Sequence, residues 1–185
     1  CTFLELIHDP TGHGMSLRNI TVSTCGLVDR IRDFAQLDLG VTLAVSLHAP
    51  NDEIRKKLMP IAHKVPMDLL LQACREYTEI THRRVTFEYA LAQGINDEAL
   101  HAEELADRLS GMLCHVNLIP VNPVTERDLA PSLDARVQDF LKVLQRRHIP
   151  VTLRRELGRD IDAACGQLRR RAKEQEEKNG SGSKM

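Results

Sequence analysis

The chain has 185 residues, of which 42% are hydrophobic and 28% are charged, and its formal net charge at pH 7 is −1. A chain of this size and composition can bury a core, and its net charge is too low for an intrinsically disordered protein. The sequence has neither a run of about 20 apolar residues nor a charged segment followed by an apolar leader. We therefore expect a soluble bacterial protein of the cytoplasm, without a membrane partner.

The cysteines lie far apart in the sequence, and their number is odd. This pattern disfavours a disulfide framework and a zinc ribbon, so we expect free thiols and no metal ligands in this chain. The first residue is cysteine rather than methionine, and it precedes an apolar stretch at 3–7 that has no helix cap. We therefore expect a fragment of a longer chain. The five cysteines are Cys1, Cys25, Cys74, Cys114 and Cys165.

Short β-branched runs alternate with amphipathic stretches along the chain. The runs have the composition of strands, and the stretches repeat apolar residues at intervals of three and four, as amphipathic helices do. In chain order, the expected elements are a strand at 19–23, a helix at 28–38, a strand at 41–47, a helix at 70–77, a strand at 84–90, a helix at 102–109, a strand at 115–120, a helix at 137–144 and a strand at 150–154.

This alternation predicts the α/β class with parallel strands. The strands can form an open doubly wound sheet or part of a (β/α) barrel, and the element pattern alone does not decide between them. In both architectures ligands bind at the carboxyl ends of the strands. We expect one domain over residues 1–172, followed by a disordered polar tail at 173–185 that is rich in glycine and serine near its end.

Small polar residues follow three of the expected strands. Ser23 lies at the end of the first strand, Ser46 and His48 at the end of the second, and Asn122 after the fourth. Hydroxyl, imidazole and amide groups suit a small zwitterionic or nucleoside-bearing ligand. Alternatively, such residues cap helices and form turns. A cap explains any one of them better, whereas three strand ends together favour a ligand.

Other motifs narrow the function. The sequence has no G-x-G-x-x-G and no P-loop, which argues against a nucleoside triphosphate site. A basic run at 169–173 could contact phosphates, but a solvated helix surface explains it better. Glu88 lies on the opposite strand face from Val85 and Phe87, where a carboxylate must be paired or must face a polar lumen. An arginine or lysine partner explains Glu88 at least as well as catalysis.

The segment 158–168 is unusual because it places Cys165 between small residues and a glycine. An open backbone of this kind would let a substrate reach the thiol, which could then act as a nucleophile. A buried, unreactive cysteine is the commoner alternative.

Four blocks of sequence stand out together: RNITVSTCG at 18–26, SLHAPND at 46–52, VNLIPVNP at 116–123 and DIDAACGQL at 160–168. They resemble the RlmN/Cfr family of radical S-adenosylmethionine (SAM) RNA methyltransferases. The similarity is nearly continuous from Phe3 to about Leu168, and the blocks occur in the family's order. The chain is most similar to the RlmN branch, whose members methylate C2 of an adenine in 23S ribosomal RNA and in some transfer RNAs.

The resemblance implies the C-terminal half of a partial (β/α) barrel and a reaction that uses two SAM molecules. One SAM methylates Cys165, and the other is cleaved at a 4Fe-4S cluster to a radical that takes hydrogen from this S-methyl group. The resulting carbon radical then adds to the adenine. The resemblance also implies an electron donor such as flavodoxin, and a monomer. The residues that it assigns to SAM binding are Ser23, Ser46, Leu47, His48 and Asn122.

The cluster motif C-x-x-x-C-x-x-C is absent from this sequence, as is a second cysteine placed to release the product. The family carries both in its N-terminal half, so we expect the chain alone to be inactive. Three alternatives stay open on the sequence: the C8-methylating resistance branch of the family, a non-catalytic remnant that binds SAM or RNA, and an unrelated α/β enzyme with a lone catalytic cysteine.

Overall fold

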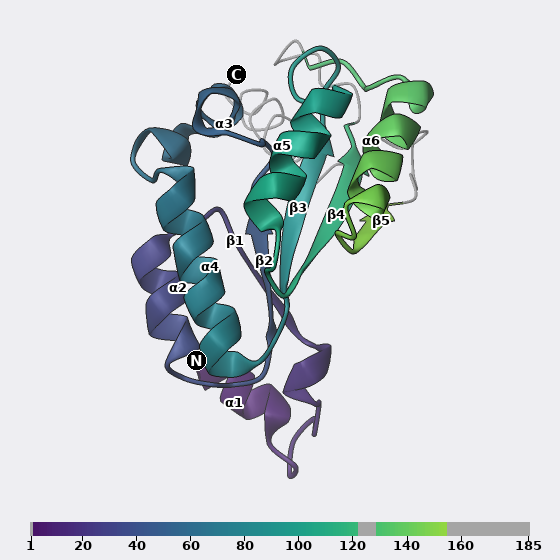
Figure 1. Cartoon of the computed structure of the whole chain (residues 1–185). Helices are drawn as coiled ribbons and strands as arrows, with labels where there is room; N and C mark the ends of the chain where they lie inside the picture. The colour runs from purple at the N-terminus through teal and green to yellow at the C-terminus, as the bar shows by residue number, and fades with distance from the viewer. Residues whose placement is uncertain (1, 122–128, 155–185) are drawn as a thin grey trace, which may run out of the picture.

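The computed structural model describes residues 2–121 and 129–154, and its centre is one parallel sheet (Figure 1). Every neighbouring pair of strands is parallel, and the strands follow one another across the sheet in chain order. A doubly wound sheet would reverse its strand order at a switch point, so this order is that of a partial barrel. The strands are β1 (Thr21–Thr24), β2 (Thr42–Ser46), β3 (Val85–Leu91), β4 (Cys114–Pro120) and β5 (Val151–Leu153).

The four predicted helices are confirmed, and all pack against the same side of the sheet (Figure 1). None of the helices in the described residues is long and apolar enough to cross a membrane. The helices are α2 (Val28–Ala35), α4 (Met67–Thr81), α5 (Ala99–Leu109) and α6 (Asp134–Arg146).

All four helices differ in length from the prediction: α5 begins at Ala99 rather than at position 102, and α6 is longer at both ends. Helix α2 ends at Ala35 rather than at position 38, because Asp38 and Gly40 adopt positive φ angles of 41° and 67° and turn the chain towards β2. Helix α4 is longer than predicted at both ends. It begins after Pro66 and ends at His82, whose φ of 51° places it in the left-handed region.

Four helical segments were not predicted: α1 (Thr2–His8), η1 (Leu17–Asn19), α3 (Asp52–Leu58) and η2 (Pro60–His63). Helix α3 shows why. It buries only Ile54 and Arg55, so its sequence has no apolar period. Its start is instead fixed by Asn51, whose side chain accepts a hydrogen bond from the Ile54 amide at 3.0 Å.

The two faces of the sheet differ in character. On β3, Val85, Phe87, Tyr89 and Leu91 are fully buried against the helices, while the alternate residues are half-buried. We call the first the apolar face and the second the polar face. Aromatic rings anchor the helices on the apolar face: Tyr89 packs against Phe140 of α6, with ring centroids 5.1 Å apart. The predicted end of the domain at 172 and the tail at 173–185 lie outside the described residues.

Candidate functional site

A row of polar side chains crosses the polar face of the sheet. The strand register places Ser46, Glu88, Asn117 and Thr152 side by side on β2, β3, β4 and β5. Asn117 Nδ2 donates to Glu88 Oε2 at 3.0 Å, and the Thr152 hydroxyl donates to Asn117 Oδ1 at 3.4 Å. His115 Nε2 lies 2.9 Å from the Thr152 hydroxyl. Hydrogen bonds join four of these residues, and Ser46 lies beside Glu88 through the strand register. We call the five residues the polar row.

Glu88 occupies the centre of the polar row. It forms no ion pair with an arginine or lysine among the described residues, so the expectation of a basic partner is wrong there. Its partner is the amide of Asn117, which binds one carboxylate oxygen. Because an amide leaves the charge of the carboxylate uncompensated, Glu88 makes this face favourable for a cation.

The turn after β2 brings His48 to the carboxyl end of the sheet. The amides of Leu47 and His48 both donate to the Glu88 carbonyl, at 3.0 and 3.2 Å. His48 has a φ of 56°, and its Nδ1 accepts a hydrogen bond from the Ala90 amide at 3.0 Å. A neutral imidazole whose Nδ1 accepts carries its proton on Nε2. His48 is therefore a donor through Nε2.

Burial, together with the charge of Arg55, lowers the pKa of His48 to about 4. The ring is consequently neutral at physiological pH. Leu47 is fully buried among the core side chains, so any contact that it makes with a ligand involves its main chain.

Asn96 holds this turn in place, and the sequence analysis missed it. Its side chain is fully buried, and its Nδ2 donates to the carbonyls of His48 and Ala90, both at 2.7 Å. Its Oδ1 accepts from the Ala92 amide at 2.7 Å, and its carbonyl accepts from the Tyr89 hydroxyl at 2.9 Å. One sequence feature could have indicated it: Asn96 lies two residues after Gly94, in the turn that follows a buried strand.

Arg55 is a second residue that the sequence analysis missed. It is fully buried, and its guanidinium donates to the carbonyls of Val65 and Cys25, at 3.1 and 3.2 Å. The loop after β1 is packed tightly here: a Cβ on Gly26, whose φ is 104°, would lie 3.1 Å from the Arg55 guanidinium. Arg55 thus ties helix α3 to the end of β1. Nothing in its spacing marks it, because a buried arginine on a short helix looks like a surface residue in sequence.

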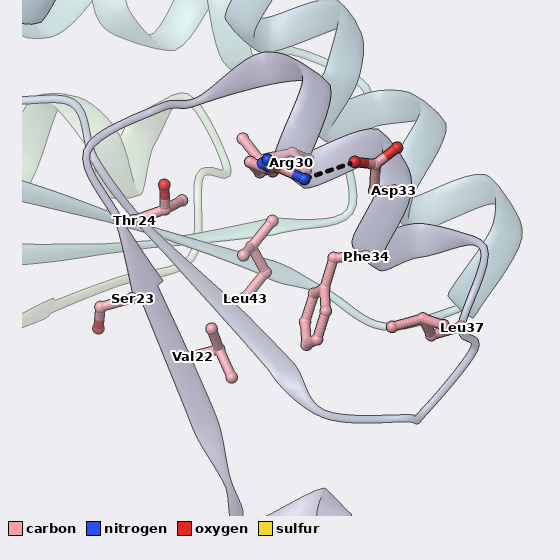
Figure 2. Close-up of a pocket in the computed structure, with 9 residues that line it drawn as sticks. Val22, Ser23, Thr24, Arg30, Asp33, Phe34, Leu37 and Leu43 are labelled. Carbon is pink, nitrogen blue, oxygen red and sulfur yellow. Dashed lines mark hydrogen bonds and ion pairs between the residues drawn. The ribbon is translucent and has the colours of Figure 1, made fainter. Parts of the chain in front are cut away.

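Ser23 lies on β1 next to Ala44 of β2, and its side chain is on the polar face. Figure 2 shows it pointing away from Val22, Leu43 and Phe34, which line a hollow of about 460 Å³ between β1 and α2. Ser23 also lines this hollow, at the edge of the sheet. Successive residues of a strand point to opposite faces. This hollow is therefore on the apolar side and does not belong to the polar row.

The structure brings three of the predicted site residues together. Ser23, Ser46 and His48 lie at or near the carboxyl ends of two neighbouring parallel strands, so they share one end of the sheet. Asn122 and Cys165 lie outside the described residues, so their positions relative to this end are not tested.

The thiols in the described part do not suit an iron–sulfur cluster. Cys74 and Cys114 are buried on the apolar side, and burial raises their pKa values to about 12 and about 11. Cys25 is exposed, but within residues 2–121 and 129–154 no three His, Cys, Asp or Glu side chains could together hold a metal ion.

Comparisons with known proteins agree with this architecture, although no protein-family model matches the chain. Relatives named probable dual-specificity RNA methyltransferase RlmN are 52% identical over 169 residues in Clostridium tetani and 54% identical over 169 residues in Desulforamulus reducens. Both alignments cover 91% of this chain and 48% of the relative. In Lachnospira eligens the identity is 49% over 180 residues, covering 97% of this chain and 51% of the relative.

Two solved structures have a similar fold. The crystal structure of a radical SAM methyltransferase from Sphaerobacter thermophilus has a TM-score of 0.83 and 48% identity, over 87% of this chain and 47% of that one. A domain of pyruvate-formate lyase-activating enzyme from Bacteroides vulgatus has a TM-score of 0.63 at 15% identity, over 83% of this chain and 90% of that one, and shows the fold alone. The chain spans about half the length of the curated relatives it matches. With about half of its residues identical to theirs over nearly its whole length, the chain belongs to the RlmN family of radical SAM methyltransferases.

Proposed function

We propose that this chain is the C-terminal, SAM-binding half of an RNA methyltransferase that methylates C2 of adenine in 23S ribosomal RNA and in some transfer RNAs. The observation that supports this most directly is the polar row, which ends beside His48 at the carboxyl end of a partial barrel. The printed names of the relatives supply the reaction class.

The groups at this end of the sheet are chemically suited to SAM. SAM combines a nucleoside, an amino acid and a positively charged sulfonium. The hydroxyls of Ser23 and Ser46 can bind the hydroxyl and amine groups of such a ligand, and Nε2 of His48 can donate to one of its acceptors. The carboxylate of Glu88 favours the positive sulfonium. Main-chain groups of Leu47 and the side chain of Asn122 complete the proposed set.

Cys165 is the proposed methyl carrier of the reaction. When bound, SAM supplies the methyl group and, after reductive cleavage at a 4Fe-4S cluster, the radical that activates it. The cysteines within residues 2–121 and 129–154 do not fit such a cluster, and we place its ligands in the part of the relatives that this chain does not span. The proposal includes a flavodoxin-like electron donor and a monomeric protein of the cytoplasm.

The test is nucleoside analysis of RNA after reaction with the complete gene product, reconstituted anaerobically with iron and sulfide. We expect 2-methyladenosine in ribosomal and transfer RNA, and none with the Cys165→Ala variant. A product methylated at C8 would assign the protein to the resistance branch, and the absence of any methylated adenine would overturn the proposal. Calorimetric titration with SAM, comparing the Ser46→Ala and Glu88→Gln variants with the unchanged protein, tests the binding site separately.

A further inference from the structure

A basic hollow of about 330 Å³ lies at the carboxyl end of the sheet, where His48 also lies. One wall is α3 and η2, which follow the carboxyl end of β2, and Figure 1 shows α3 at the opposite end of the molecule from α1. The other wall is Leu129, whose segment is tied to the end of β3 by the bridge between Ala92 and Pro131. The lining residues are Lys56, Lys57, Leu58, Pro60, His63 and Leu129.

Three lysines lie in this region. Lys56 and Lys57 are exposed on the last turn of α3, and Lys64 is exposed directly after η2. None of the three forms an ion pair with a described residue. The acidic residues of α3 occupy its first turn, and Asp52 there already accepts a hydrogen bond from the Met67 amide at 2.9 Å.

Basic residues on the helical side of the molecule behave differently. Arg32 pairs with Glu76 at 2.7 Å, Arg108 pairs with Asp68 at 2.7 Å, and Arg147 pairs with Glu103 at 2.8 Å. Their charges are neutralised within the fold. Lys56 and Lys57, which line the hollow, and Lys64, which follows the lining residue His63, have no such partner among residues 2–121 and 129–154.

Helix α3 is also fixed firmly to the rest of the site. Arg55 joins it to the end of β1 through the Cys25 carbonyl, and the Asn51 side chain donates to Glu104 of α5 at 2.9 Å. A lysine carried on an anchored helix keeps a constant position relative to the sheet end. A ligand bound to this hollow is thus held at a fixed position at the carboxyl end of the sheet.

We propose that Lys56, Lys57 and Lys64 bind the phosphodiester backbone of the RNA substrate and hold it at the entrance to the polar row. This rests on the proposed function for the choice of RNA. Lysine binds phosphate as a point charge with three donors. His63 carries the one aromatic ring among the described residues that line the hollow, and Leu58 and Pro60 offer only apolar surface. Because three lysines outnumber this single ring, we expect the contact to be mainly to the backbone rather than to sequence.

The experiment measures binding of a fluorescein-labelled RNA hairpin to the complete gene product by anisotropy, over a series of salt concentrations. The test variant is Lys56→Ala, Lys57→Ala and Lys64→Ala together. The matched control is Arg18→Ala, Arg84→Ala and Lys142→Ala, which removes the same charge; Arg18 and Arg84 precede β1 and β3 at the far end of the sheet, and Lys142 lies on α6. Thermal unfolding confirms that both variants fold.

We expect the test variant to bind RNA at least about tenfold more weakly. The association constant should also depend less on salt: the negative slope of its logarithm against the logarithm of the salt concentration should become shallower by about 2, as loss of three phosphate contacts requires. The control should stay within about twofold of the unchanged protein. Replacing the loop adenine of the hairpin should not change the ratio of the RNA dissociation constants of the test variant and the unchanged protein.

Two results would overturn the proposal. An equal loss of RNA affinity in the control variant would show that only total charge matters. If poly-glutamate displaced the labelled hairpin as effectively as unlabelled RNA does, the surface would instead fit an acidic protein partner. SAM titration of the same variants separates this surface from the proposed function. If the unchanged protein neither binds SAM nor methylates RNA while its RNA affinity still depends on the three lysines, the proposed function fails and the RNA surface stands.

Discussion

The apolar and polar faces of the sheet are made by alternate residues of the same strands, yet they perform different tasks. On β3 the side chains of Phe87 and Tyr89 are fully buried beneath the helices, while the carboxylate of Glu88 between them accepts a hydrogen bond from the side-chain amide of Asn117. The apolar face carries the buried area that stabilises the fold. The polar face carries hydrogen-bonding groups whose loss the fold should tolerate. Stability and chemistry are therefore separated by one-residue steps along a strand, and substitutions can test this separation.

The largest expected effect is on the apolar face. Phe87→Ala removes a fully buried ring from the centre of the core and should lower the free energy of unfolding by about 3–5 kcal/mol. The neighbouring substitution Thr86→Ala, on the polar face, is the matched control and should change it by no more than about 0.5 kcal/mol. Urea unfolding followed by circular dichroism measures both. Equal losses at the two positions would show that the faces do not differ in this way.

Asn96 connects the two faces, because it is buried but holds the turn that carries His48. Asn96→Ala leaves the carbonyls of His48 and Ala90 without their donor, and should cost about 3 kcal/mol of stability. It should also weaken SAM binding, since the turn is then free to move. Asn96→Asp keeps the acceptor for the Ala92 amide but turns an oxygen towards the carbonyls of His48 and Ala90 in a fully buried site, so it should cost at least as much as Asn96→Ala. If Asn96→Ala unfolds at lower urea but binds SAM with unchanged affinity, the turn does not position the ligand.

Sequence patterns predicted the apolar face well and the polar face only in outline. The five strands and four helices were found because burial on one side leaves a period of two in Val85, Phe87 and Tyr89, and a period of three to four in the helices. Ser23, Ser46 and His48 were found because residues after parallel strands must share one end of the sheet. These signals depend on spacing within one segment.

Asn96 and Arg55 were missed for the opposite reason. Each is buried through contacts with residues distant in sequence: Arg55 with Cys25, and Asn96 with His48. No local period marks a polar side chain whose partners come from another loop. The amide partner of Glu88 was also missed, because the neighbour of a strand residue is set by the register between β3 and β4, and that register is not encoded within either strand.

The pH dependence of stability tests the state of His48. Its folded pKa of about 4 lies below the ordinary value of 6.5, so the unfolded chain takes up the proton at higher pH than the folded chain. The contribution of the neutral ring is fully present above pH 6.5 and is lost as the pH falls from 6.5 towards 4. We expect a loss on the order of 3 kcal/mol over this range.

His48→Asn is the matched variant for this measurement. Its side-chain oxygen can accept from the Ala90 amide, and asparagine tolerates the positive φ at this position. In this variant, the urea midpoint should therefore no longer fall between pH 6.5 and 4 by the amount that His48 contributes. The pH dependence due to other groups should stay the same. Identical pH profiles for the variant and the unchanged protein would mean that His48 is not neutral and buried as described.

The smallest expected effect concerns the thiols, and it contrasts a buried cysteine with the proposed methyl carrier. Cys74 lies on the apolar side of α4, fully buried, and its pKa is raised to about 12 by burial. Cys74→Ala should cost about 1 kcal/mol of stability and leave methyl transfer to RNA unchanged. Cys165→Ala should have the reverse effect, with methyl transfer abolished and unfolding unchanged.

Because a raised pKa leaves almost no thiolate, Cys74 should also resist alkylation in the native protein, whereas exposed Cys25 reacts. Mass spectrometry after brief iodoacetamide treatment measures both, and rapid native labelling of Cys74 would show that the apolar side admits water.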